Sequence, residues 1–201
     1  MELSIMVNSH SKKQEKMSDK HSFLRNFWKE RKMVGAMAPS SKYLAKKMLE
    51  KIDFSTAKVI VELGPGTGVF TRKILKELSS DGVLFVFELN DSFMNQLKKE
   101  FSDPRVILIH DSAEKIGEYL EKHGYSQADA VASSLPLANF PSDLKNRILK
   151  ESHRVMHSNS LYVQFQYSLN AKKTIKQFFR HMEIAFTPAN FPPAFIYYCR
   201  K

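Results

Sequence analysis

The chain has 201 residues, of which 43% are hydrophobic, and a formal net charge of +10 at pH 7. This length suits one α/β domain with a continuous core and a short extension. Cys199 is the single cysteine, which excludes an intrachain disulfide and a cysteine-ligated metal cluster. No apolar run approaches the roughly 18 residues that a membrane-spanning helix needs. Residues 1–50 contain 11 Lys or Arg and 5 Asp or Glu. This basic end would attract phosphate on nucleic acid or on an anionic membrane. A solvated basic face without a partner is also compatible with this composition.

The first 52 residues have two different compositions. Residues 1–19 are polar, charged and aperiodic, and we expect them to be disordered. Residues 20–52 are predicted to form helices that interact with a membrane or cover the site. On the first of these helices, the apolar face has Phe23, Leu24, Phe27 and Trp28, and the basic face has Arg25, Lys29 and Lys32. This pattern is typical of a helix in a membrane interface, and a helix packed on the domain is equally compatible with it.

A second helix is predicted from Lys42 to Ile52. The sequence GAMAPSS at residues 35–41 ends the preceding helix, and Ser40 or Ser41 can cap this one. The spacing of its apolar residues predicts that Tyr43, Leu44, Met48 and Leu49 face inward, with Lys46 and Lys47 outside.

A glycine-rich turn organises the remaining domain, residues 53–201. The sequence VIVELGPGTGVF, residues 59–70, predicts a buried strand, a tight turn and the start of a helix. Gly64, Gly66 and Gly68 stand at alternate positions in the turn. Glycine permits a sharp turn and the close approach of a ligand, and the helix N-terminus offers unpaired N–H groups. The spacing GxGxG differs from the GxGxxG of dinucleotide-binding proteins, which favours a ligand without a pyrophosphate.

An acidic residue follows this turn at a suitable distance. The strand FVFEL reaches Glu88, which lies 24 residues after Gly64. An acidic residue about 20 residues after the first glycine, at the end of the neighbouring strand, can accept hydrogen bonds from both hydroxyls of a ribose. The turn and Glu88 together predict a site for a nucleoside.

Strands and helices alternate along the rest of the chain, which predicts parallel pairing with right-handed crossovers. The predicted strands after the first are residues 83–88, 106–110, 130–134, 161–167, 183–186 and 195–199. The predicted helices are residues 91–100, a helix from residue 113, and residues 142–153 and 171–179. His153 and His157 would share one helix face, but the glutamate of an HExxH zinc motif is missing, so we interpret them as surface residues near a helix end.

The sequences VIVELGPGTG and FVFEL together resemble the class I methyltransferases, which bind S-adenosylmethionine. The resemblance implies a Rossmann-like α/β fold with a seven-stranded, mostly parallel sheet and an antiparallel last strand. It implies S-adenosylmethionine as the cofactor and S-adenosylhomocysteine as the product. The cofactor-binding residues that it implies are Glu62, Gly64, Gly66, Gly68, Glu88, Leu89, Asp111, Ser112, Ser134 and Leu135.

The resemblance also implies a separate role for each of three acidic residues. Glu62 lies near the amine of the donor's methionine part, Glu88 holds the ribose, and Asp111 accepts a hydrogen bond from the adenine amino group. Capping of the following helix is an equally simple role for Asp111.

The segment SSLPLANFP, residues 133–141, faces the transferred methyl group in class I methyltransferases. In the ribosomal RNA adenine dimethylases it has Asn or Asp, one residue, Pro and then an aromatic side chain that stacks on the base. Here these positions are Ser134, Pro136 and Leu137. Leucine has no π-face, so stacking worth about 1–3 kcal/mol per base is not available at this position. This difference counts against a nucleobase as the methyl acceptor.

A closer resemblance is to the bacterial phospholipid N-methyltransferases, which methylate phosphatidylethanolamine towards phosphatidylcholine. The matching motifs are VGAMAPSS at 34–41, ELGPGTGVFT at 62–71, SSLPLANFP at 133–141 and NFPPAFIYY at 190–198. The chain departs from that family in a longer polar N-terminus and in Ala138, where we expect a larger apolar residue.

This resemblance implies a phospholipid N-methyltransferase that is cytoplasmic and peripheral on the inner face of the cell membrane. The N-terminal amphipathic helix would dock on anionic phospholipid, and an aminophospholipid would be the substrate; no protein partner is implied. Two alternatives stay open, an RNA adenine N6-methyltransferase and a donor-binding protein without catalysis.

The candidate catalytic residues are Ser134 and Tyr43. Tyr43 is a candidate proton acceptor, or an aromatic side chain facing the amine, although a core position is the commoner role for a tyrosine. We further expect an apolar rim for acyl chains, formed by Leu135, Leu137, Phe140 and the loop 191–195.

Overall fold

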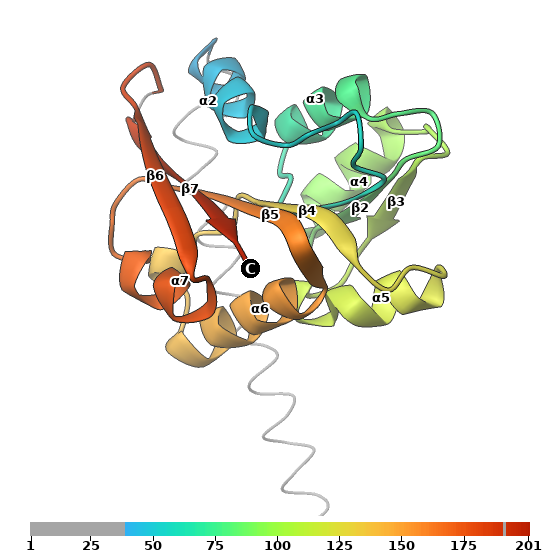
Figure 1. Ribbon diagram of the computed structural model, residues 1–201. Coiled ribbons are helices and arrows are strands. Elements are labelled where there is room, and N and C mark those ends of the chain that lie inside the picture. The colour runs from blue at the N-terminus through green and yellow to red at the C-terminus, as the bar shows by residue number, and fades with distance from the viewer. Residues whose placement is uncertain (1–38, 191) are drawn as a thin grey trace, which may run out of the picture. The chain divides into compact units, whose positions relative to one another are not determined.

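The computed structural model describes residues 39–190 and 192–201 (Figure 1). Residues 1–38, which include the predicted disordered segment and the amphipathic helix, lie outside the described residues, as does Phe191. Residues Ala38–Lys201 form one compact unit.

A seven-stranded sheet forms the centre of this unit, with the strand order β3-β2-β1-β4-β5-β7-β6. Its strands are β1 (Val59–Leu63), β2 (Val83–Phe87), β3 (Val106–Ile109), β4 (Ala128–Ser133), β5 (Met156–Gln166), β6 (His181–Thr187) and β7 (Ala194–Arg200). β7 pairs antiparallel with β5 and β6, and the other neighbouring strands pair in parallel. The predicted Rossmann-like fold with an antiparallel last strand is therefore confirmed. The strand order reverses between β1 and β4, and ligands of open α/β sheets bind beyond the carboxyl ends of the strands at such a reversal.

Helices cover both faces of the sheet (Figure 1). On one face lie α2 (Pro39–Leu49), α3 (Val69–Glu77) and α4 (Asp91–Glu100), and on the other lie the short η1 (Ala113–Lys115), α5 (Ile116–Lys122), α6 (Ser142–Arg154) and α7 (Lys172–Phe178). A single turn, η2 (Leu137–Asn139), follows β4. None of the helices in the described part of the chain is long and apolar enough to cross a membrane. Most elements agree with the predicted ranges to within two residues, and α2 and β5 are the exceptions.

α2 contributes to the core of the unit rather than to a separate N-terminal segment. Its side chains Leu44, Ala45, Met48 and Leu49 are buried among residues of β1, β5 and β7. Tyr43, which we predicted to face inward, is 62% exposed. That prediction is wrong because each residue of an α-helix turns by about 100°, and Ala45 rather than Tyr43 shares the direction of the other buried side chains.

β5 begins five residues earlier than predicted, in an irregular segment. Ala128 of β4 pairs with Met156, whereas Ala130 pairs with Leu161, so three extra residues of β5 bulge out between these pairs. A polar run of sequence, residues 157–160, makes up this bulge and hides the start of the strand from pattern analysis.

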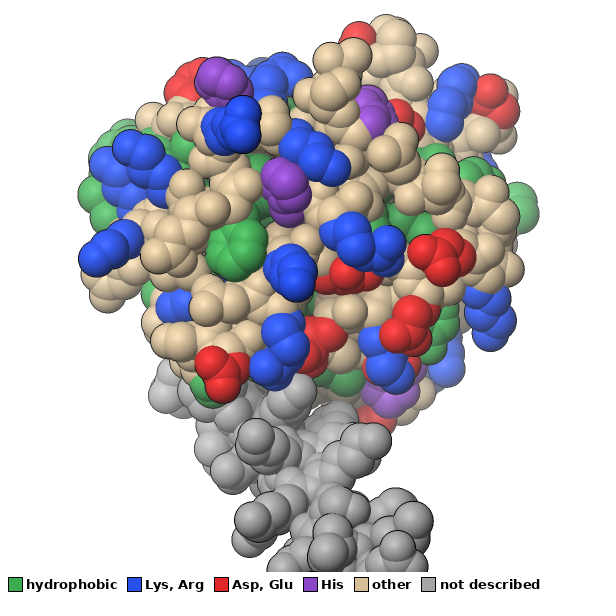
Figure 2. Space-filling view, turned by 60° about the horizontal axis from the view of Figure 1, so that its bottom comes forward, with side chains coloured by type: hydrophobic (Ala, Val, Ile, Leu, Met, Phe, Trp, Pro, Cys, Tyr) green, Lys and Arg blue, Asp and Glu red, His purple; other side chains and the backbone are tan. Residues whose placement is uncertain are grey.

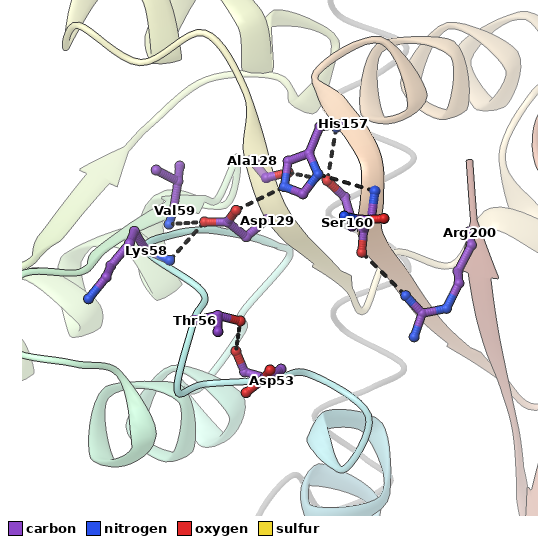
Figure 3. Close-up of polar contacts among 10 residues, drawn as sticks. Asp53, Thr56, Lys58, Val59, Ala128, Asp129, His157, Ser160 and Arg200 are labelled. Carbon is purple, nitrogen blue, oxygen red and sulfur yellow. Dashed lines mark hydrogen bonds and ion pairs between the residues drawn. The ribbon is translucent and has the colours of Figure 1, made fainter.

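Side-chain hydrogen bonds close the bulge (Figure 3). The backbone N–H of His157 donates to Ser160 Oγ at 2.9 Å, and the N–H of Asn159 donates to His157 Nδ1 at 3.2 Å. His157 Nε2 lies 2.9 Å from Asp129 Oδ1 of β4. The predicted helix face shared by His153 and His157 is therefore wrong, because α6 ends before His157, which belongs to β5.

Candidate active site

The glycine-rich turn between β1 and α3 has a backbone that glycine alone adopts easily. Gly64, Gly66 and Gly68 have φ angles of 69°, 57° and 76°. A Cβ atom at Gly64 would lie 2.9 Å from Leu135 Cδ2, and one at Gly68 would lie 2.8 Å from the ring of Phe101. The turn therefore needs glycine both for its left-handed conformation and for the space around it.

Two buried carboxylates border this turn. Glu62, in β1, accepts a hydrogen bond from Thr71 Oγ1 at 2.7 Å through Oε2, whereas its buried Oε1 has no hydrogen-bond partner among the described residues. Glu88 follows β2 and accepts from the backbone N–H of Gly66 at 3.2 Å and from that of Asn90 at 2.8 Å. Glu88 thus ties the end of β2 to the glycine turn, and its predicted contact with a ribose stays a prediction.

The environment of Glu62 favours its protonated form. Burial raises the pKa of Glu62, the hydrogen bond from Thr71 opposes this, and the charge of Glu88 adds to it, so that the pKa is about 8. A carboxylic acid that is buried with one free oxygen is well placed to interact with a cationic group of a ligand, because a nearby positive charge favours the ionised form.

The predicted adenine-contacting residues lie just after β3. Asp111 accepts hydrogen bonds from the N–H of Ser112 at 2.7 Å, from Lys115 Nζ at 2.8 Å and from Tyr119 Oη at 3.0 Å. Partial burial raises the pKa of Asp111, but the hydrogen bonds outweigh it and hold the pKa below its usual value. Ser112 Oγ caps η1 by accepting from the N–H of Glu114. Leu89, beside Glu88, is partly buried.

Residues 134–140, which follow β4 and include η2, form a loop, here called the acceptor loop, that packs against the turn. The N–H of Ser134 donates to the carbonyl oxygen of Leu63 at 2.9 Å, which places both predicted residues Ser134 and Leu135 beside Gly64. Ser134 is buried at the end of β4. Tyr43, by contrast, points away from the core on α2, and no described contact brings it to these residues.

Two glutamines of β5, which the sequence analysis missed, hold the acceptor loop. The Nε2 atoms of Gln164 and Gln166 donate to the carbonyl oxygen of Leu135 at 3.0 and 2.8 Å. Gln166 Oε1 accepts from the N–H of Ala138 at 3.1 Å, and Gln164 Oε1 accepts from Tyr162 Oη at 2.9 Å. The signal in the sequence was a pair of amides at alternate positions of an otherwise apolar stretch, residues 161–166, where buried polar groups need partners.

The predicted apolar rim is wrong for three of its members. Leu137 is fully buried in η2, and Leu135 and Phe140 are buried beside it. These three side chains lie on the inner side of the acceptor loop because η2 turns the chain back on itself. Gln164 and Gln166 hold the loop in this position. The side chains of Leu135, Leu137 and Phe140 therefore belong to the core and present no rim to solvent.

Two curated relatives match this chain to very different extents. Ornithine lipid N-methyltransferase from Singulisphaera acidiphila is 29% identical over 92% of this chain and 97% of that protein. Ribosomal RNA small subunit methyltransferase A from Sulfurihydrogenibium sp. is 35% identical, but over 37% of this chain and 28% of that protein.

The fold also occurs in solved methyltransferases. The structure of 1,6-didemethyltoxoflavin-N1-methyltransferase from Burkholderia thailandensis, with bound 1,6-didemethyltoxoflavin and S-adenosylhomocysteine, matches with a TM-score of 0.69 over 94% of this chain and 89% of that chain, at 11% identity. At this identity the similarity supports the fold alone. Residues 29–178, well over half of the chain, match the family described as ribosomal RNA adenine dimethylase. The chain therefore belongs to this family of methyltransferases, whose methyl donor is S-adenosylmethionine.

Proposed function

We propose that this protein methylates the amino head group of phosphatidylethanolamine, towards phosphatidylcholine, at a membrane surface. The observation that carries the proposal is the similarity to an ornithine lipid N-methyltransferase along nearly the full length of both chains. The name of that relative describes a methyl transfer to nitrogen on a lipid.

The residues around the glycine turn fit S-adenosylmethionine. Gly66 has no Cβ, which allows a ligand to approach the backbone of the turn, and Gly64 allows Leu135 of the acceptor loop to pack against it. Glu62 offers a buried oxygen, without a partner among the described residues, for the donor's ammonium group. Glu88 accepts a backbone hydrogen bond through each of its two oxygens, and because a carboxylate has about four acceptor positions it can also accept from ribose hydroxyls.

The protein's own contribution to the reaction is mainly positioning. S-adenosylmethionine supplies, when bound, a methyl group on a positively charged sulfur that is already activated for transfer. The acceptor loop, fixed by Gln164 and Gln166, sets the position of Ser134 at the end of β4, and we assign to Ser134 a hydrogen bond with the lipid head group. An ammonium group has a pKa near that of lysine, about 10.4, so the site must select the neutral amine. Tyr43 has no role in this proposal, because it is exposed on the far side of α2.

An RNA adenine methyltransferase is the second candidate, and the family match and the net charge of +10 favour it. A flipped base needs a stacking surface in the active site. Leu137 stands where that family has its stacking aromatic residue, and its side chain is fully buried. We therefore rank the lipid proposal above the RNA proposal.

Methyl transfer from labelled S-adenosylmethionine tests the proposal directly. The acceptors are phosphatidylethanolamine in vesicles with anionic lipid, ornithine lipid in the same vesicles, and undermethylated ribosomal RNA. We expect transfer to phosphatidylethanolamine and none to RNA. Transfer to ornithine lipid alone would correct the head group, and transfer to RNA alone would refute the lipid proposal.

Membrane docking is a separate part of the proposal and rests on Phe27 and Trp28, which lie outside the described residues. Replacing both with glutamate should abolish sedimentation with anionic vesicles, because the apolar face would no longer insert. The control is Asn95→Glu with Gln96→Glu, which adds the same charge on the exposed face of α4. Loss of donor binding in the first variant alone would mean that the helix packs on the domain instead.

A further inference from the structure

A hollow of about 470 Å³ opens at the amino-terminal edge of the sheet, where β6 begins and β7 ends. β6 runs parallel to β1, so this edge is opposite to the one with the glycine turn. Leu161 of β5 pairs with Arg200 of β7, and Arg200 pairs with His181 of β6, so the three form one row across the strands. The volume is within the range of small-molecule sites, about 300–1,000 Å³.

The charges that line this hollow are mostly positive. Lys51, Arg180 and Arg200 are cationic, and Glu183 is the one acidic residue among the residues that line it. With His181 counted as neutral, three cations and one anion give a net charge of +2. Figure 2 shows the face turned up from the bottom of Figure 1, and blue side chains predominate over red ones in its left half, the side of α7 and β6.

Several of these groups are held in place by contacts with the domain. Lys51 Nζ lies 2.5 Å from Glu183 Oε1 and 4.6 Å from the centroid of the Tyr198 ring. Arg200 Nη1 donates to the carbonyl oxygen of Asn159 in the β5 bulge at 3.2 Å (Figure 3). A guanidinium has five N–H donors, so Arg200 retains others for a ligand.

Arg180, at the end of the segment that follows α7, is the second guanidinium. It is exposed, and it has no hydrogen bond or ion pair with any other described residue. Guanidinium groups bind phosphate oxygens in pairs through parallel N–H donors, which is the recognition that Arg provides better than Lys.

We propose that this hollow, here called the basic pocket (Lys51, Arg180, His181, Glu183, Tyr198 and Arg200), binds the phosphate monoester group of a small ligand. A phosphate monoester has a charge of about −1.5 to −2 at pH 7, which balances the charge of the pocket. The group comes from a soluble phosphate ester or from a lipid head group with a terminal phosphate. Because the basic pocket and the glycine turn lie at opposite edges of the sheet, this binding is separate from the methyl-transfer site.

Calorimetry on the full chain, with glycerol phosphate as the soluble probe, tests the proposal. The variant Arg180→Gln with Arg200→Gln should bind the probe at least about tenfold more weakly, because it loses charged hydrogen bonds to phosphate. The control Lys98→Gln with Lys99→Gln removes the same charge from the exposed face of α4 and should leave the affinity unchanged.

A third variant guards against a folding defect. Glu183→Gln removes the single acid of the basic pocket and should raise the affinity for glycerol phosphate several-fold, a gain that an unfolded protein would not show. Binding of S-adenosylhomocysteine should stay the same in every variant, which reports an intact fold independently of catalysis.

Vesicles of phosphatidylcholine, with and without phosphatidic acid, distinguish the two sources of the phosphate. Binding of glycerol phosphate that depends on Arg180 and Arg200 supports a soluble ligand. Binding to phosphatidic acid vesicles alone, with the same dependence, supports a lipid head group. Equal behaviour of the pocket variant and its control with both probes, in protein that binds S-adenosylhomocysteine, would overturn the proposal.

Discussion

The glycine turn and the acceptor loop lie side by side at one edge of the sheet, yet their buried polar groups are satisfied in different ways. Beside the turn, Glu62 of β1 keeps one buried oxygen without a partner among the described residues. In the loop, the side-chain amides of Gln164 and Gln166 are paired through both oxygen and nitrogen atoms. A buried polar atom without a partner costs free energy, so the turn gains stability from a ligand that supplies one.

This difference indicates that the two halves of the site respond to different changes. Substitutions at the turn should change donor affinity and its pH dependence, because Glu62 has a buried oxygen with which a ligand can pair. The acceptor loop is complete within the protein, so its residues should affect stability and the rate of transfer more than donor affinity.

The largest effect should come from the contact that joins the two halves. Gly64→Ala puts a Cβ 2.9 Å from Leu135 Cδ2 at a φ of +69°. Left-handed strain of about 1–2 kcal/mol should lower the free energy of unfolding. Overpacking against Leu135, worth about 1–3 kcal/mol, should also displace the turn, so affinity for S-adenosylhomocysteine, measured by calorimetry, should fall by roughly 10- to 100-fold.

Gly124→Ala is the matched control for this substitution. Gly124 has a φ of +83°, and a Cβ added there would have nothing within 4 Å of it. This variant should lose stability through backbone strain and keep its donor affinity. If both variants bound the donor normally, the close packing at Gly64 would not matter for the site.

Glu88→Ala should have the next largest effect. It removes the acceptor for the N–H groups of Gly66 and Asn90 and the proposed partner of the ribose. Hydrogen bonds to a charged group contribute about 1.5–3 kcal/mol each, so the free energy of donor binding should weaken by a few kcal/mol at most. Glu77→Ala, on the exposed side of α3, should leave it unchanged. Unchanged calorimetric affinity with an intact fold would remove Glu88 from the donor site.

The turn was predictable from sequence because its chemistry depends on local spacing. Gly64, Gly66 and Glu88 are residue types that few other structures require at those intervals, and the alternation of strands and helices gave the sheet around them. A local pattern of this kind needs no knowledge of distant contacts.

The acceptor loop was less predictable because distant residues determine its shape. Leu137 is buried because η2 turns it inward and because Gln164 and Gln166 bind the loop at Leu135. These glutamines lie 29 and 31 residues after Leu135 in the sequence. Tyr43 was misplaced for a different reason. α2 has apolar or small residues in most directions around its axis, and its sequence does not state which of them meets the sheet.

Glu62 provides a pH test of the donor half. Its folded pKa of about 8 lies above the ordinary value of 4.5, so the folded protein holds a proton that the unfolded chain releases. The stability of the donor-free protein should therefore fall as the pH rises from about 4.5 to about 8, by a few kcal/mol at most, and stay level above. Glu62→Gln should remove this decline in chemical denaturation measured across the pH range.

Bound S-adenosylhomocysteine, which has the same ammonium group as the donor, should also reduce this decline in stability with pH. Its ammonium group favours ionised Glu62, which lowers the folded pKa towards the unfolded value. Saturation with S-adenosylhomocysteine should thus give the wild type a flatter pH profile. The same slope with and without this ligand would show that Glu62 does not meet the ammonium group.

The smallest effect is expected in the acceptor loop, where a substitution should change stability and the rate of transfer rather than donor affinity. Gln166→Leu leaves the N–H of Ala138 without its acceptor and removes one of two donors to the Leu135 carbonyl oxygen. The N–H of Ala138 is partly buried, so leaving it unpaired should cost at most about 1–3 kcal/mol, which chemical denaturation would detect as a lower free energy of unfolding. Methyl transfer should slow because Ser134 is held less firmly. Affinity for S-adenosylhomocysteine should stay close to that of the wild type, because the carboxylates beside the turn are untouched.

The control Gln96→Leu, on the exposed face of α4, should change neither the free energy of unfolding nor the rate of methyl transfer. A Gln166→Leu protein that kept its stability and lost donor affinity would mean that the two halves of the site are not distinct.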